Sequence, residues 1–168
     1  DLVAVSHFAN KYQPASFDFT FDISVPTATI TSLVHGSTMS VVDVISGSWW
    51  DLPSNDAVDK DATPSPISVK IQALGGTYAG RYWRDDPAGW VLAETWNNST
   101  TTVKVYSSSW TYIKPSALDW ENNVWYSVSV KIRDIADNEQ TNFVVGLSSI
   151  MFLCDETPPE TTITSPAQ

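Results

Sequence analysis

The sequence has only one cysteine, Cys154, among its 168 residues. A single cysteine excludes an internal disulfide, and no C-x-x-C pair provides the spacing of a structural zinc site. No apolar run approaches the roughly 20 residues that a membrane-spanning helix requires. We therefore expect neither a disulfide-stapled domain nor insertion into a membrane.

Basic residues are also scarce. The chain carries 9 lysines and arginines against 19 aspartates and glutamates, which gives a formal net charge of −10 at pH 7. So acidic a chain repels phosphate backbones and anionic membrane surfaces, and this argues against nucleic acid as a partner. The same excess of carboxylates suits the capture of a hard cation such as Ca²⁺.

Catalytic motifs are missing as well. The sequence contains no G-x-S-x-G, no H-E-x-x-H and no glycine-rich phosphate loop. Its two histidines, His7 and His35, fall in a tail and in a turn. Asp85 and Asp86 are adjacent on a turn, so they do not face one substrate as a catalytic carboxylate pair would. We therefore predict that the protein is not an enzyme.

No window of a dozen residues shows a clean helical period, whereas apolar and polar residues alternate in many places. Residues 17–21 alternate phenylalanine with polar residues, and residues 126–133 alternate as strictly. Half-buried strands have this pattern, and turn signals every roughly 8–12 residues are typical of a β-sandwich. We predict an all-β antiparallel sandwich of seven to nine strands. The expected strands lie at 17–22, 27–32, 38–50, 67–74, 77–84, 90–96, 101–107, 109–113, 124–133 and 143–154.

An internal repeat determines the expected organisation. Residues 21–32 read FDISVPTATITS and residues 154–165 read CDETPPETTITS. Six positions are identical, each 133 residues apart, and they include Asp22 with Asp155 and Pro26 with Pro159. A strand end, a proline joint and the first strand of a unit thus occur twice. This predicts a tandem array whose unit is about 133 residues long. The alignment also places Cys154 on the last strand as a small buried residue.

The repeat divides the chain into an N-terminal extension (1–22), one sandwich (23–155), and a linker with the start of a next repeat (156–168). The extension carries Phe17, Phe19 and Phe21 on one strand face, and burying each is worth roughly 1.5–3 kcal/mol. The unit 23–155 already has its own closing strand. We therefore expect this strand either to close a preceding domain of a longer polypeptide, or to insert into a neighbouring copy of the chain by strand exchange.

Three motifs occur in order along the unit. The joint and first strand read DETPP (155–159) and TITSP (162–166), the second element reads ISGSWWD (45–51), and the third reads YSVSV (126–130) followed by DIADN (134–138). This pattern resembles the Ig-like repeats of large bacterial extracellular and surface proteins. The resemblance implies an immunoglobulin-like sandwich over 23–155 with adjacent Ig-like repeats as neighbours. The sequence departs from the pattern at Trp49 and Trp50, where small residues are usual, and at Asp137, where glycine is usual.

Acidic residues are expected to converge at one end of such a sandwich. The loop between the second and third strands, the loop before the last strand and the entering joint emerge there together. They carry Asp22, Asp51, Asp134, Asp137 and Asn138. Ca²⁺ prefers six to eight oxygen ligands of this kind, so we expect a calcium site that stiffens the joint. The alternative is an Asx-rich turn, in which Asp134 and Asn138 only bond nearby backbone amides.

Aromatic residues are abundant, with eight tryptophans in the chain. Tyr82, Trp83, Trp90 and Trp96 straddle the predicted hairpin turn at 85–89. They could form a flat platform on which sugar rings stack, as in carbohydrate-binding modules. The alternative is cross-strand aromatic pairing that covers the sandwich core.

These observations favour one function and leave a second open. The expected function is a structural repeat or subunit of an extracellular filament, stalk or adhesin at the cell surface. Its partners would be copies of itself, as a homopolymer, or adjacent Ig-like repeats. The alternative is a glycan-binding module attached to a secreted enzyme.

Overall fold

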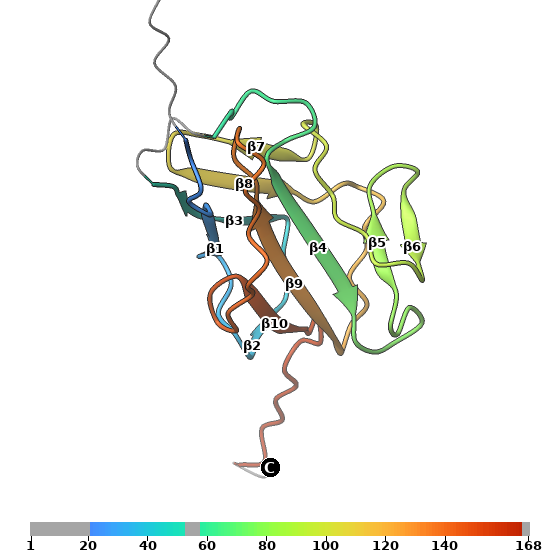
Figure 1. Ribbon diagram of the computed structural model, residues 1–168. Helices are drawn as coiled ribbons and strands as arrows, with labels where there is room; N and C mark the ends of the chain where they lie inside the picture. The colour runs from blue at the N-terminus through green and yellow to red at the C-terminus, as the bar shows by residue number, and fades with distance from the viewer. Residues whose placement is uncertain (1–20, 53–57, 166–168) are drawn as a thin grey trace, which may run out of the picture.

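The computed structural model describes residues 21–52 and 58–165, and over these residues it contains ten strands and no helix (Figure 1). The strands are β1 (Thr27–Ile30), β2 (Ser37–Met39), β3 (Val44–Trp50), β4 (Ile67–Ala73), β5 (Tyr82–Arg84), β6 (Gly89–Val91), β7 (Val103–Val105), β8 (Ser109–Ile113), β9 (Val124–Ile132) and β10 (Ser149–Cys154). No described segment is a helix long and apolar enough to cross a membrane.

Two sheets pack face to face. One has the order β1-β3-β8-β7, and the other has the order β2-β10-β9-β4-β5-β6. Four strands against an extended sheet that includes two added short strands is the arrangement of variable-type immunoglobulin sandwiches. The prediction of an all-β, immunoglobulin-like sandwich is therefore confirmed. The strands number ten rather than seven to nine, and four of them (β2, β5, β6 and β7) are only three residues long.

One strand pair is parallel rather than antiparallel. The strand expected at 38–50 is in fact two strands, and the chain passes from one sheet to the other between them. Before this crossing, β2 lies parallel to β10, and Met39 pairs with Cys154. Alternation alone cannot reveal such a crossing, since both strands keep the same period.

The strands expected at 90–96 and 101–107 are only three residues long, and two other predicted strands lose their first residues to a turn. Residues 143–148 form a turn instead of the start of β10, with Gly146 at φ +84 and the amides of residues 147–149 bonded to the carbonyl of Val144. Residues 77–80 also form a turn rather than a strand, and the amide of Gly80 reaches back to the carbonyl of Ala73. In both places a glycine at positive φ lies in the turn before the strand begins.

In the core, Trp110 of β8 packs across Gly47 of β3. Its indole is fully buried, and Nε1 donates to the carbonyl oxygen of Thr29 on β1 at 3.1 Å. This approach requires glycine at position 47. A Cβ placed there would lie 1.7 Å from the Thr29 carbonyl oxygen and 2.8 Å from the Trp110 indole nitrogen. One tryptophan thus ties together three strands of the first sheet.

A second aromatic cluster closes the opposite part of the core. Tyr126 stacks on Phe152 with ring centroids 5.8 Å apart, and Trp120 meets both rings edge-on. The Tyr126 hydroxyl accepts a hydrogen bond from the amide of Glu121 at 2.7 Å. A tyrosine near the start of β9 that bonds upstream backbone is the tyrosine corner of immunoglobulin-like folds. Burial raises the pKa of Tyr126 to about 12, so the hydroxyl stays protonated in this contact.

Asp85 and Asn97 have structural roles. Asp85 Oδ1 accepts from the Trp83 indole and from the Tyr112 hydroxyl, and its amide donates to Asn97 Oδ1. Asn97 is buried and donates to the carbonyls of Val69 and Trp83. The network joins both sheets. It also accounts for an aspartate directly after β5.

Glycine at position 47 gives a test of this core. We expect Gly47→Ala to lower the free energy of unfolding by about 3 kcal/mol, the upper end of the usual cost of overpacking, because a backbone carbonyl cannot move aside. Chemical denaturation measures the change. Gly75→Ala is the matched control, since a Cβ there meets only Val124 at 3.9 Å. Equal stability of the two variants would contradict the assignment.

Candidate functional site

Three carboxylates meet at the end of the sandwich where the described chain enters β1. Asp22 precedes β1, Asp51 follows β3 and Asp134 follows β9. Each offers an oxygen within 4.8 Å of the other two. Asp51 is 5% exposed and Asp134 is 6% exposed. The structure therefore brings together three of the five residues that the sequence assigns to a calcium site.

The Asp134 carboxylate also holds its own loop. Its Oδ1 accepts hydrogen bonds from the amides of Ala136 and Asn138, each at 2.8 Å, and its Oδ2 accepts one from Asn138 Nδ2 at 2.8 Å. This is the Asx-turn arrangement that the sequence left as the alternative. The turn and the carboxylate cluster coexist, because the turn orients Asp134 toward Asp22 and Asp51.

The other two predicted ligands lie differently. Asp137 is outside the cluster: its side chain is 85% exposed, and Oδ1 lies 3.5 Å from Arg133. Its backbone adopts a left-handed φ of +66. Asn138 turns its amide nitrogen to Asp134 and to the Asp22 carbonyl oxygen, 3.2 Å away, so it bridges the joint to the loop.

The electrostatics of the cluster favour a bound positive charge. Burial, chiefly, and the nearby charges of Asp134 and Asp22 raise the pKa of Asp51, whereas the hydrogen bond from the Leu52 amide opposes this rise. Neither Asp22 nor Asp134 forms an ion pair with a described residue. A proton or a metal cation at this position would relieve the mutual repulsion.

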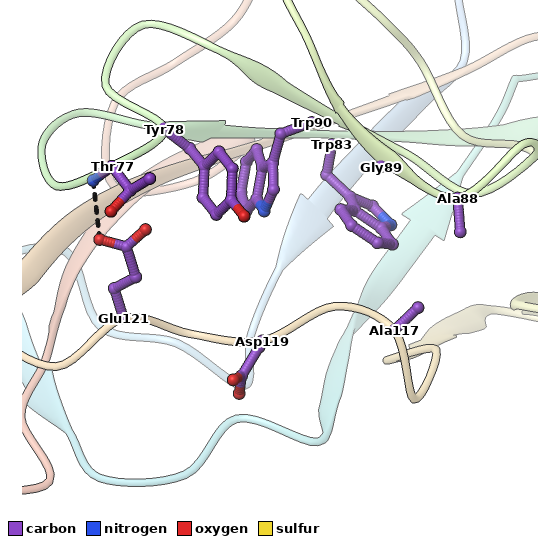
Figure 2. Close-up of a pocket in the computed structure, with 9 residues that line it drawn as sticks. All are labelled: Thr77, Tyr78, Trp83, Ala88, Gly89, Trp90, Ala117, Asp119 and Glu121. Carbon is purple, nitrogen blue, oxygen red and sulfur yellow. Dashed lines mark hydrogen bonds between the residues drawn. The ribbon is translucent and has the colours of Figure 1, made fainter.

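A second candidate site is a pocket of about 500 Å³ between the β5–β6 hairpin and the segment that joins β8 to β9 (Figure 2). Tyr78 and Trp90 stack on one wall with centroids 5.4 Å apart. Asp119 and Glu121 stand on the opposite wall, where Glu121 accepts from the Thr77 amide at 2.8 Å. Sequence analysis missed both carboxylates, because the joining segment carries no motif and meets the hairpin only in the folded chain.

The predicted glycan platform is divided among different surfaces. Trp83 and Trp90 are paired across β5 and β6 and both line the pocket, although Trp83 itself is buried. Tyr82 pairs with Val91, so it lies on the other face of the hairpin. Trp90 also stacks on Tyr126, with centroids 6.0 Å apart. The aromatic packing that the sequence left as the alternative is thus present around the pocket.

Trp96 belongs to a separate group of side chains. It stacks on Phe143 at 5.5 Å, and the ammonium groups of Lys70 and Lys131 lie 4.7 and 4.8 Å from its ring centroid. Contacts of this kind occupy the faces of the ring. Trp96 therefore does not continue the wall formed by Tyr78 and Trp90.

The predicted assembly strand falls mostly outside the described residues. Phe17 and Phe19 lie there, and only Phe21 is described. Phe21 is 81% exposed and belongs to no strand.

Comparisons with protein-family models, with curated proteins and with solved structures find no match to this chain.

The raised pKa of Asp51 gives a pH-dependent prediction. The folded protein binds this proton more tightly than the unfolded chain, so the Asp51 contribution to stability rises as pH falls through the raised pKa toward the ordinary value of 3.8. We expect Asp51→Asn in chelator to be more stable than the parent protein at neutral pH. The difference should shrink toward about pH 4, because the parent carboxyl is then protonated.

Thermal unfolding over this pH range measures the difference. Asp61→Asn is the control, because this substitution removes the same charge from a side chain that is 88% exposed. A difference in stability between Asp51→Asn and the parent that stays constant at all pH values would contradict the raised pKa of Asp51.

Proposed function

We propose that the protein is a structural repeat or subunit of an extracellular filament, stalk or adhesin. The observation that carries the proposal is a joint motif that occurs twice, at opposite ends of one sandwich. Asp22 lies beside Asp134, just past the last residue of β9. Its counterpart in the repeat, Asp155, directly follows Cys154, which pairs with Val124 at the first residue of β9.

The length of β9 separates the two joints. Nine residues at about 3.3 Å each span about 30 Å. Figure 1 shows the described segment before β1 at one end of the molecule and the segment after β10 leaving at the other. Units joined in this way extend end to end instead of folding back on one another. This favours a fibre or stalk at the cell surface over a compact assembly.

Exposed apolar residues near the entering joint supply a surface for a partner copy. Phe21, Ile23 and Val25 are 81%, 72% and 55% exposed. Val25 also lines a groove of about 440 Å³ with Trp50, Val144 and Leu147. Apolar side chains that gather this way mark protein contacts more often than free surface. They support burial of the entering segment against a neighbouring copy, by strand exchange or between tandem domains.

Calcium is the proposed cofactor of the entering joint. Asp22 belongs to the joint, whereas Asp51 and Asp134 belong to the sandwich, so a cation shared by their carboxylates would fix one to the other. Hard oxygen ligands of this type are those that Ca²⁺ prefers, and water and backbone carbonyls complete such sites. The proposed role is mechanical stiffening rather than chemistry.

The assembly proposal is tested by removing the entering segment. We expect the full chain to form oligomers or filaments and the chain without residues 1–21 to be folded and monomeric. Size-exclusion chromatography with electron microscopy measures this. A full-length chain with Phe17, Phe19 and Phe21 all changed to serine should behave as the truncation does. Filaments formed by either variant would contradict the proposal.

The calcium proposal is tested by melting. We expect Ca²⁺ to raise the melting temperature, with about 2.7 kcal/mol of stabilisation at 100 times the dissociation constant. Asp51→Asn should abolish the response. Asp137→Asn should retain it, because that side chain lies outside the cluster. Identical melting curves in Ca²⁺ and in chelator would exclude the site.

The second candidate function is glycan binding, and the pocket in Figure 2 is the observation that favours it. An aromatic wall facing carboxylates offers both stacking and hydrogen-bond acceptors to a sugar ring. Titration of the full chain with soluble polysaccharides separates the two functions. Saturable binding that is lost in Trp90→Ala and kept in Trp50→Ala would favour the glycan-binding module.

A further inference from the structure

The segment that follows β10 is bound to the sandwich it leaves. The Asp155 amide donates to the Met39 carbonyl at 3.0 Å. Asn122 then holds the next two residues with both ends of its side-chain amide: Oδ1 accepts from the Glu156 amide at 2.7 Å, and Nδ2 donates to Thr157 Oγ1 at 3.0 Å. One exposed asparagine therefore fixes the direction in which the chain leaves the unit.

The segment that precedes β1 is bound in a matching way to the sandwich it enters. Asn138 Nδ2 donates to the Asp22 carbonyl oxygen at 3.2 Å. The Ser24 amide donates to Asp22 Oδ1 at 2.9 Å, and the Thr157 amide donates to Asp155 Oδ1 at the same distance. Asp22 and Ser24 correspond to Asp155 and Thr157 in the repeat. The two joints thus share one turn as well as one sequence motif.

We propose that each joint is clamped from both sides, by Asn122 of the preceding unit and by Asn138 of the following one. The partner is a second copy of this unit, which follows residues 155–157 at the end of the sandwich where the chain leaves β10. The proposal rests on the tandem arrangement in the proposed function and adds how consecutive units are held. In the joint, Asp155 takes the place of Asp22 in the following unit.

The atoms needed for the two clamps do not compete. The preceding unit uses the Asp155 amide, the Glu156 amide and the Thr157 hydroxyl. The following unit uses the carbonyl oxygen of the aspartate, as Asn138 does at Asp22. Only residues 155–159 separate Cys154 from the position that corresponds to Thr27, the first residue of β1. Because this linker is only five residues long, the two clamps together fix the angle between neighbouring units.

The first experiment measures the clamp of the leaving segment in the full chain. Hydrogen–deuterium exchange should show the Glu156 amide exchanging about tenfold faster in Asn122→Ala, because its acceptor is lost. The Thr157 amide should keep its rate, since Asp155 is its acceptor. Asn142→Ala is the control and should change neither rate. An unchanged Glu156 rate in Asn122→Ala would overturn the clamp.

The second experiment measures a complete joint. A two-unit chain in which residue 159 is joined directly to residue 27 of a second copy contains the joint in its natural register. Small-angle X-ray scattering should give one narrow distance between the two units. Asn122→Ala in the first unit or Asn138→Ala in the second should broaden it. Thr157→Val should act as Asn122→Ala does, and Thr157→Ser should restore the narrow distance.

Two outcomes separate this proposal from the proposed function. A broad distance in the unchanged two-unit chain overturns the double clamp, whether or not the natural chain assembles. A natural chain that stays monomeric counts against the proposed function but leaves the clamp standing, because the two-unit chain supplies the neighbour covalently.

Discussion

The packing of Trp110 against Gly47 is the contact on which the rest of the structure depends. The indole donates to the Thr29 carbonyl, so β8, β3 and β1 are held at one crossing point. From the other side, the buried Gln140 amide accepts from the Ala28 amide and donates to the Ala28 carbonyl. The first strand is thus held by Trp110 of β8 and by Gln140 in the segment that follows β9. Its fixed position brings the preceding residue Asp22 next to Asp51 and Asp134.

Much of this could be predicted from the sequence, and the reason is periodicity. The alternation over 126–133 identifies β9, which is observed at Val124–Ile132. The repeat correctly places the last strand and the buried Cys154. The convergence of Asp22, Asp51 and Asp134 follows from loop connectivity in an immunoglobulin-like sandwich, which fixes which loops share an end.

The sequence was less informative wherever non-local contacts decide the structure. Asn97 reads as part of an exposed turn, yet it is buried, because Asp85 and two backbone carbonyls use its side chain. Asp119 and Glu121 become a pocket wall only when the β8–β9 segment meets the β5–β6 hairpin. Asn122 reads as an ordinary turn residue, and its contacts lie 34 and 35 residues away in the chain. No local pattern encodes contacts of this kind.

The Asp22 carboxylate belongs both to the turn before β1 and to the carboxylate cluster. Asp22 Oδ1 accepts from the Ser24 amide, so this oxygen shapes the turn, while the carboxylate also faces Asp51 and Asp134. A cation at the cluster would therefore bind the same carboxylate that shapes this turn. The Asn138 contact to the Asp22 carbonyl holds the backbone of that residue, so the side chain can respond to charge without displacing the chain. If a cation binds there, its removal should therefore loosen the contact between Asp22 and the sandwich, while Asn138 still holds the backbone direction.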